Sequence, residues 1–285
     1  MKTAKKIIAV MLSSMLAVLC FAGCSKSVEA DEITSETMLI AYKEEVKPFV
    51  YTENGELTGF DVELFKTIFN DIKNEYKNYE FVKVDADYKI GEDVYCVDSE
   101  GKDCVAYVMI GGVQKDVDDI NNTMSFTDDV INNRVITITK DGYGVTDYTK
   151  LSGKSIGVVS EPAAAALNKH ATVKAGAKTV KDYPDTASAL KDLDAGVIQA
   201  IVIDEFTYNT SGADTSAYIT LNGELENISY VYALKKWDWY KDAINSGIYE
   251  LQSPEYNDAD EFTPIVEKYF GYDASSFDYI PPETK

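Results

Sequence analysis

The stretch Glu53 to Ile72, ENGELTGFDVELFKTIFNDI, joins a turn to a helix with one apolar face. Its first residues place Asn beside Gly, which is typical of a turn. Phe60, Leu64 and Ile68 then recur at every fourth position, the spacing of an amphipathic helix. Asp61 lies in the first turn of that helix, where the helix dipole favours an acid. The stretch therefore predicts a turn followed by a helix that presents one apolar face to the core.

Short apolar runs alternate with helical patterns through the rest of the chain. The runs that we predict as strands are Met38–Tyr42, Glu80–Val84, Cys104–Ile110, Val135–Lys140, Ser155–Val159, Val197–Ile203 and Ile228–Leu234. The run VIQAIVI is almost continuously apolar, as expected of a buried parallel strand. Strands that alternate with helices in this way indicate the α/β class.

The order of elements occurs twice, from about residue 38 and again from about residue 155, although the sequence itself does not repeat. In the second half, Pro162 lies near the start of a predicted helix, and Asp185 caps another that Gly196 ends. We therefore expect two lobes. The runs ITITKDG and SYVYALKK are the places where we expect the chain to cross between them.

The composition restricts the partners of the protein. The 285 residues suit one large domain or two small ones, and a hydrophobic content of 45% is ordinary for a globular core. The net charge is −21. Because so acidic a surface repels nucleic acid and anionic membranes, we expect no nucleic-acid partner.

The N-terminal segment has the features of an export signal. Three lysines within the first six residues precede the apolar run Ile7–Leu19, which is short for a membrane span and fits a signal peptide. The run ends in Phe21-Ala22-Gly23-Cys24, which resembles a bacterial lipobox and implies lipidation of Cys24. The alternative is a plain secretory signal with an incidental cysteine. We expect a signal peptide at residues 1–23, a polar tether at 24–36 and an anchored, extracytoplasmic protein.

Two cysteines remain in the body of the chain. Cys96 and Cys104 flank a segment with a glycine, so a hairpin would bring them face to face. Export makes a disulfide possible, and two free thiols are the alternative. A metal site needs more ligands than two cysteines, and the one histidine, His170, is distant in sequence, so we expect no metal.

Four predicted strand ends carry residues that suit contact with a ligand. They are Tyr42–Glu45, Gly111–Val113, Ser160–Glu161 and Asp204. In open α/β sheets ligands bind beyond the carboxyl ends of the strands, and two of these ends come from each predicted lobe. The sequence thus predicts a cleft between the lobes. The alternatives are that Asp204 only caps the next turn, that Glu161 is solvated and that the glycines only permit a tight turn.

Two motifs carry a resemblance to a known family. Val46–Tyr51, followed by Gly55–Leu64, resembles the opening signature of the amino-acid type of extracellular solute-binding proteins, family 3, the receptors of ABC importers. Weaker matches continue through Ser125–Asp128, Leu151–Val158 and Glu267–Gly271. The resemblance implies a two-lobed periplasmic-binding-protein fold of type II. Each lobe is then a mostly parallel sheet flanked by helices, with lobe 1 at 37–137 and 233–285 and lobe 2 at 138–232.

The resemblance also implies how a ligand is held. Asp204 matches the aspartate that meets a ligand amino group, and Val46 occupies the position of an aromatic cover. The ligand-binding residues that we predict are Tyr42, Lys43, Val46, Phe49, Gly111, Gly112, Val113, Ser160, Glu161 and Asp204.

One expected residue of the family pattern is absent. The arginine that clamps a ligand carboxylate would fall at Ile120 or Asp119, and Arg134 is the one arginine of the chain. Glu161 would repel a carboxylate, and Pro162 lacks an N–H donor. Either a lysine, Lys43 or Lys47, takes the place of the guanidinium, or acids such as Glu161 and Asp204 hold an amine that has no carboxylate.

The function that these features favour is a lipid-anchored receptor. It would bind an amino acid or related small amine and deliver it to an ABC permease, as a monomer and without a cofactor. The alternatives are a sensor lipoprotein without transport, or a cleft enzyme such as a dehydratase. One histidine provides no catalytic triad, and Gly111-Gly112 lacks the pattern of a nucleotide site.

Overall fold

The computed structural model describes residues 37–72, 76–90, 96–97, 103–114, 124–236, 240–253 and 260–271. The chain divides into two units, Met1–Glu36 and Thr37–Lys285, and the fold described is that of the second. The predicted signal peptide, the tether and Cys24 lie outside the described residues, as does segment 115–123, where the family pattern places its arginine.

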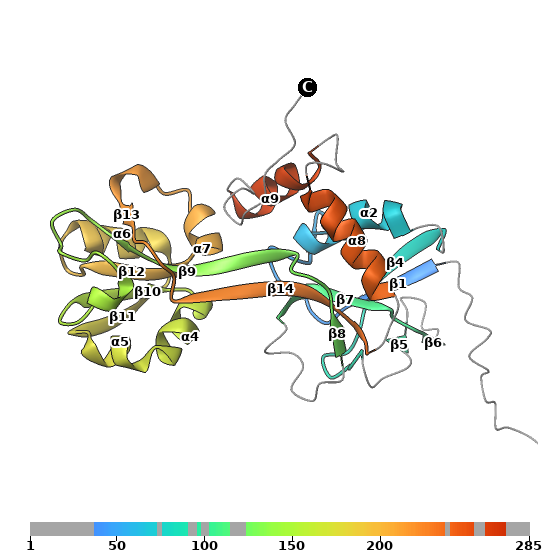
Figure 1. Cartoon of the computed structure of the whole chain (residues 1–285), viewed down its shortest axis with the longest axis horizontal. Helices are drawn as coiled ribbons and strands as arrows, with labels where there is room; N and C mark the ends of the chain where they lie inside the picture. The colour runs from blue at the N-terminus through green and yellow to red at the C-terminus, as the bar shows by residue number, and fades with distance from the viewer. Residues whose placement is uncertain are drawn as a thin grey trace, which may run out of the picture. The chain divides into compact units, whose positions relative to one another are not determined.

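A ten-stranded sheet runs through the described residues (Figure 1). Its main path has the order β11-β10-β12-β9-β14-β7-β1-β4. The strands are β1 (Thr37–Tyr42), β4 (Asn78–Lys83), β7 (Val108–Gln114), β8 (Met124–Phe126), β9 (Ile131–Thr139), β10 (Ser155–Val159), β11 (Thr179–Tyr183), β12 (Ala200–Asp204), β13 (Ile219–Thr220) and β14 (Glu226–Lys235). Near one end β1 pairs in parallel with β4 and β7, and at the other β10 pairs in parallel with β11 and β12. Two mostly parallel sets of strands are thus present, as predicted.

Helices and small sheets complete the fold. The helices are α2 (Phe60–Ile72), α4 (Glu161–Lys169), α5 (Ala171–Gly176), α6 (Thr186–Asp194), α7 (Glu205–Asn209), α8 (Tyr240–Gln252) and α9 (Phe262–Phe270), with 3₁₀ turns η2 (Tyr148–Lys150) and η3 (Thr215–Ala217). The two-stranded sheets are β2 (Tyr51–Glu53) with β3 (Glu56–Thr58), and β5 (Cys96–Val97) with β6 (Asp103–Cys104). The predicted apolar face of α2 is confirmed, since Phe60, Leu64 and Ile68 are all buried.

The predicted strand Cys104–Ile110 is wrong as one element. Cys104 belongs to β6, which pairs with β5, whereas β7 begins at Val108 and pairs with β1. The apolar pattern is continuous although the pairing partner changes within it. Cys96 lies directly opposite Cys104 in the antiparallel β5–β6 pair. Opposite Cα atoms in such a pair are about 4.5–5.5 Å apart, within the range that a disulfide spans. The disulfide itself stays a prediction.

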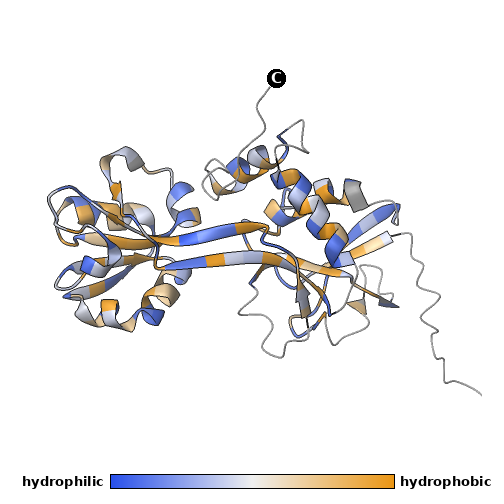
Figure 2. Cartoon of the chain, in the orientation of Figure 1, coloured by the Kyte–Doolittle hydropathy of each residue, from blue (hydrophilic) through white to orange (hydrophobic). Residues whose placement is uncertain are grey.

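Strands β9 and β14 connect the two ends of the sheet. They pair with each other over Ile131–Val135 and Glu226–Tyr230, and beyond this region β9 pairs with β12 while β14 pairs with β7. In Figure 2 the part of β9 where the two strands pair is largely hydrophilic, in agreement with its sequence INNRV. These are the two crossings of the fold, and they position β12 on one side and β7 on the other.

Helix α7 contributes to two hydrophobic cores. Tyr208 belongs to a cluster with residues of β10, β12 and α6, whereas Phe206 belongs to a cluster formed by β1, β7, α2, α8 and α9. Phe206 stacks on Phe270 of α9, with ring centroids 4.0 Å apart, and on Tyr230 of β14 at 6.0 Å. A Cβ atom on Gly271 would approach the Asn209 carbonyl oxygen to 3.1 Å, so the end of α9 also lies against α7.

Asp61 links α2 to β7. It is 1% exposed, and its Oδ2 accepts hydrogen bonds from the backbone N–H groups of Gly111, at 2.8 Å, and Gly112, at 2.9 Å. Burial raises the pKa of Asp61 to about 6, although the two N–H groups act in the opposite direction. Oδ1 has no hydrogen-bond partner among the described protein atoms. The carboxylate thus fixes the two glycines at the cost of a desolvated charge.

We expect Phe206→Ala to lower the free energy of unfolding by about 3 kcal/mol, because it leaves a cavity between aromatic rings. Tyr249→Ala is the control, since Tyr249 is 55% exposed and its loss should change stability by less than about 0.5 kcal/mol. Urea denaturation of both variants measures the difference. Equal effects would show that α7 does not depend on this packing.

The raised pKa of Asp61 predicts a pH dependence of stability. The folded pKa, about 6, exceeds the ordinary value of 3.8, so the folded protein binds this proton more tightly than the unfolded chain. The contribution of Asp61 is therefore most favourable below about pH 4 and is lost as the pH rises through 6.

The variant Asp61→Asn isolates this contribution, because its amide oxygen can still accept from both glycines. The unfolding free energy of the wild type, minus that of the variant, should fall by up to roughly 3 kcal/mol between pH 4 and pH 7. A difference that is the same at both pH values contradicts the assignment.

Candidate functional site

The ends of β10 and β12 bring three predicted site residues together. Val159 pairs with Ile203 in the parallel register, so the next residues, Ser160 and Asp204, emerge at the same edge of the sheet. Ser160 caps α4, with its Oγ accepting from the Ala163 N–H at 3.4 Å, and it has a φ of 86°. Glu161 follows as the first residue of α4 and is exposed. This edge therefore carries one buried and one exposed carboxylate.

Asp204 is held from two directions. Its Oδ1 accepts hydrogen bonds from the Thr207 N–H of α7 and from the Asn133 amide of β9, each at 3.0 Å. Its Oδ2 is buried and has no hydrogen-bond partner among the described protein atoms. The capping role that sequence considerations left open is thus present. The cap and the Asn133 amide both bind Oδ1, so Oδ2 is the carboxylate oxygen that no described protein group contacts through a hydrogen bond.

Arg134 is engaged within the protein. On β9, its Nε donates to Glu205 Oε2 at 2.8 Å and its Nη2 to Oε1 at 2.5 Å. Such a two-point pair uses the planar face with which a guanidinium would clamp a ligand carboxylate. Arg134 is the one arginine of the chain, and its Nε and Nη2 atoms are engaged with Glu205.

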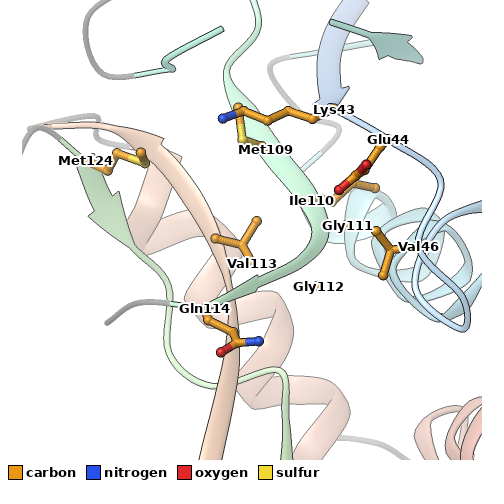
Figure 3. Close-up of a pocket in the computed structure, with 10 residues that line it drawn as sticks. All are labelled: Lys43, Glu44, Val46, Met109, Ile110, Gly111, Gly112, Val113, Gln114 and Met124. Atoms are coloured by element: carbon orange, nitrogen blue, oxygen red, sulfur yellow. The ribbon is translucent and has the colours of Figure 1, made fainter. Parts of the chain in front are cut away.

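A pocket of about 240 Å³ lies at the end of β7 and beside the segment after β1 (Figure 3). Its lining residues are Lys43, Glu44, Val46, Met109, Ile110, Gly111, Gly112, Val113, Gln114 and Met124. Five of the predicted ligand-binding residues are among them: Lys43, Val46, Gly111, Gly112 and Val113. In Figure 3 the Lys43 side chain extends toward Met109, and Met124 comes from the separate strand β8.

Two predicted residues next to the pocket do not line it. Phe49 is buried against Phe60, Tyr230 and Phe270, and a Cβ atom at Gly112 would come within 2.8 Å of its ring. The ring of Phe49 therefore packs directly against Gly112. Tyr42 is half-buried, and burial followed by the charge of Glu45 raises its pKa.

The two candidate lysines differ in their surroundings. Lys47 lies over the ring of Tyr51, with its Nζ 4.7 Å from the centroid. Lys43 lines the pocket, and no hydrogen bond or ion pair of its side chain is found within the described part of the chain. Of the two, Lys43 is the cation that a ligand in the pocket would meet.

The sequence prediction missed four lining residues, Met109, Ile110, Gln114 and Met124, whereas Glu44 lies in the predicted strand end Tyr42–Glu45 but was not among the ligand-binding residues. Gln114 was missed because the predicted strand ended at Ile110, whereas β7 continues to Gln114. Met124 lies ten residues farther along the chain, in β8, and carries no local signal.

Tyr230 of β14 lies within the electrostatic reach of both buried aspartates. Burial raises its pKa to about 12, and the charges of Asp204 and Asp61 add to this, while a hydrogen bond with Asn133 lowers it. Asn133 also donates to Asp204, so the crossing strands organise the surroundings of Asp204.

The described residues contain neither a metal-binding cluster nor a membrane-spanning helix. No three His, Cys, Asp or Glu side chains there are grouped so that they could hold a metal ion. Among the helices of that same part of the chain, none has both the length and the apolar character needed to cross a membrane.

Comparison with known proteins shows that the chain is similar to amino-acid-binding proteins. No family model matches it. The arginine-binding extracellular protein ArtP of Bacillus subtilis is 23% identical over 252 residues, covering 87% of this chain and 91% of the relative. The probable amino-acid-binding protein YxeM of the same organism is 25% identical over 280 residues, covering 94% of this chain and 96% of the relative.

A solved structure shows the same fold. The substrate-binding protein of a polar amino acid ABC uptake transporter from Streptococcus thermophilus is 23% identical, covers 84% of this chain and 87% of its own, and superposes with a TM-score of 0.62. With the signature at Val46–Leu64, these matches span nearly the whole described chain. The chain is therefore similar to the amino-acid type of extracellular solute-binding proteins, family 3, and has the two-lobed type II α/β fold.

Proposed function

We propose that this protein is the receptor of an ABC importer and binds an amino acid or a related small amine between its two lobes. The observation that carries the proposal is the pocket at the end of β7, where four other predicted residues, Val46, Gly111, Gly112 and Val113, line the same space as Lys43. The relatives support it, because the names of both Bacillus subtilis proteins are those of amino-acid binders. We place lobe 1 at 37–137 and 233–285, and lobe 2 at 138–232.

Lys43 is the anchor for the ligand carboxylate in this proposal. It takes the place of the family's arginine, with the difference that an ammonium is a point charge and offers no planar two-point contact. Because an ammonium constrains the orientation of a carboxylate less than a guanidinium does, Lys43 suits a ligand that is held mainly by its amino group.

Asp204 is the partner of the ligand amino group. Its Oδ1 is fixed by Thr207 and Asn133, so an ammonium brought by lobe closure would meet Oδ2. Ser160 and Glu161 lie at the same edge and complete the lobe 2 side of the site. In this arrangement Lys43 faces the ligand carboxylate. The buried Asp204 and the exposed Glu161 face the ligand amino group.

Export and anchoring follow from the N-terminal sequence. We propose removal of residues 1–23, lipidation of Cys24 and a tether up to residue 36, which would hold a monomeric receptor at the extracytoplasmic face beside its permease. An oxidised Cys96–Cys104 pair is consistent with that location.

A thermal-shift screen of candidate ligands tests the proposed function. Residues 25–285 are heated with each of the twenty amino acids and with polyamines and quaternary amines, because a ligand that binds the folded state raises Tm by mass action. At least one compound should raise Tm in proportion to the logarithm of its concentration. A screen in which nothing binds would contradict the receptor function.

Lys43→Met should weaken binding of an amino acid found in this screen by about tenfold or more, because the carboxylate loses its counter-ion. Lys47→Met is the matched control, since Lys47 lies over Tyr51, and its affinity should change less than threefold. Isothermal titration calorimetry gives both values. If the two variants are equally impaired, Lys43 is not the anchor.

Asp204→Asn tests the amine contact without removing the helix cap, because the amide oxygen still accepts from Thr207. Affinity should fall at least tenfold, since a charge-assisted contact is lost, whereas the free energy of unfolding should stay within about 1 kcal/mol of the wild type. Unchanged affinity would leave Asp204 with a structural role alone.

A further inference from the structure

One wall of the pocket is apolar, whereas Lys43, Glu44 and Gln114 contribute polar groups to the rest of its lining. Met109 and Val113 of β7 are buried, Met124 of β8 is partly buried, and in Figure 3 these side chains lie around the same space. Val46 and Ile110 add further aliphatic surface. No aromatic residue is among the lining residues that the structure describes, so a cation would find no ring to lie against there.

The charges at the pocket nearly cancel. Lys43 and Glu44 are the charged groups among its lining residues, and Glu44 is exposed. An additional positive charge on a ligand side chain would meet Lys43 without a buried acid to neutralise it. An additional negative charge would face the apolar wall and a surface of high negative net charge.

The size and the softness of the wall restrict the ligand further. A volume of about 240 Å³ lies just below the range of about 300–1,000 Å³ that is usual for small-molecule pockets, so it suits a single small side chain with its backbone groups. Methionine side chains are flexible and polarisable and adapt to unbranched chains. Two methionines in one wall therefore favour a slender apolar side chain.

We propose that this pocket selects amino acids with an uncharged, apolar side chain, of which an unbranched aliphatic or thioether chain fits best. The inference rests on the proposed function and deepens it. The ligand carboxylate lies at Lys43, and the side chain lies against Met109, Val113 and Met124. The protein would then differ in specificity from its relative ArtP, which is named for arginine.

A competition series separates this inference from the proposed function. Dissociation constants are measured by calorimetry for L-methionine, L-norleucine and L-leucine, and for L-arginine, L-histidine, L-glutamate, L-glutamine and putrescine. The apolar group should bind at least tenfold more tightly than every member of the second group. Tightest binding by any member of the second group overturns the inference and leaves a receptor function in place. Binding by none of the compounds counts against both.

The variant Val113→Thr tests the apolar wall, because threonine has the shape of valine but carries a hydroxyl. An apolar ligand side chain cannot form a hydrogen bond with that hydroxyl. Affinity for L-methionine should fall about tenfold. Val231→Thr is the matched control, since Val231 is the buried cross-strand partner of Val113 and does not line the pocket. Its affinity should stay within about twofold of the wild type. Equal losses in the two variants, or no loss in Val113→Thr, would overturn the assignment.

Discussion

The packing of Phe206 against Tyr230 and Phe270 is the contact on which the arrangement of the site depends. Helix α7 has five residues, too few to be stable by itself, so its position comes from tertiary contacts. A buried aromatic ring contributes about 3–5 kcal/mol, whereas the half-exposed Arg134–Glu205 pair contributes about 1 kcal/mol or less. The ring therefore fixes the helix, and the ion pair sets its orientation. Because Asp204 caps α7, the position of its carboxylate follows from the same packing.

The two buried aspartates show how similar environments lead to different roles. Asp61 and Asp204 each have one oxygen that accepts two hydrogen bonds and one that has no partner among the described atoms. Asp61 accepts its hydrogen bonds from the two glycines of β7, which line the pocket. Asp204 accepts its hydrogen bonds from Thr207, as the cap of α7, and from Asn133 of the crossing strand β9. Asp204 thus lies where β12 and α7 meet the crossing strand β9.

Local patterns predicted the elements, and contacts distant in sequence decided the site. The fourfold spacing in α2 and the short apolar run of β10 were sufficient, because α2 buries one continuous apolar face and every residue of β10 is buried. The change of pairing partner between Cys104 and Val108 leaves no trace in hydropathy, so the strand was placed wrongly. Asp61 was predicted only as an acid favoured by a helix dipole, because its bond to Gly111 joins residues fifty positions apart. Met124 reaches the pocket from a separate strand, which no spacing rule reveals.

The use of the single arginine explains the chemistry of the rest of the site. The guanidinium of Arg134 pairs at two points with Glu205 and so links β9 to α7. In the proposed binding mode the ammonium of Lys43 meets the ligand anion, and it imposes no plane on its partner. With the carboxylate less strictly oriented, discrimination between ligands has to come from elsewhere. The apolar wall of Met109, Val113 and Met124 is the part of the pocket able to supply it, because burying a charged or polar side chain there costs far more than burying a methylene.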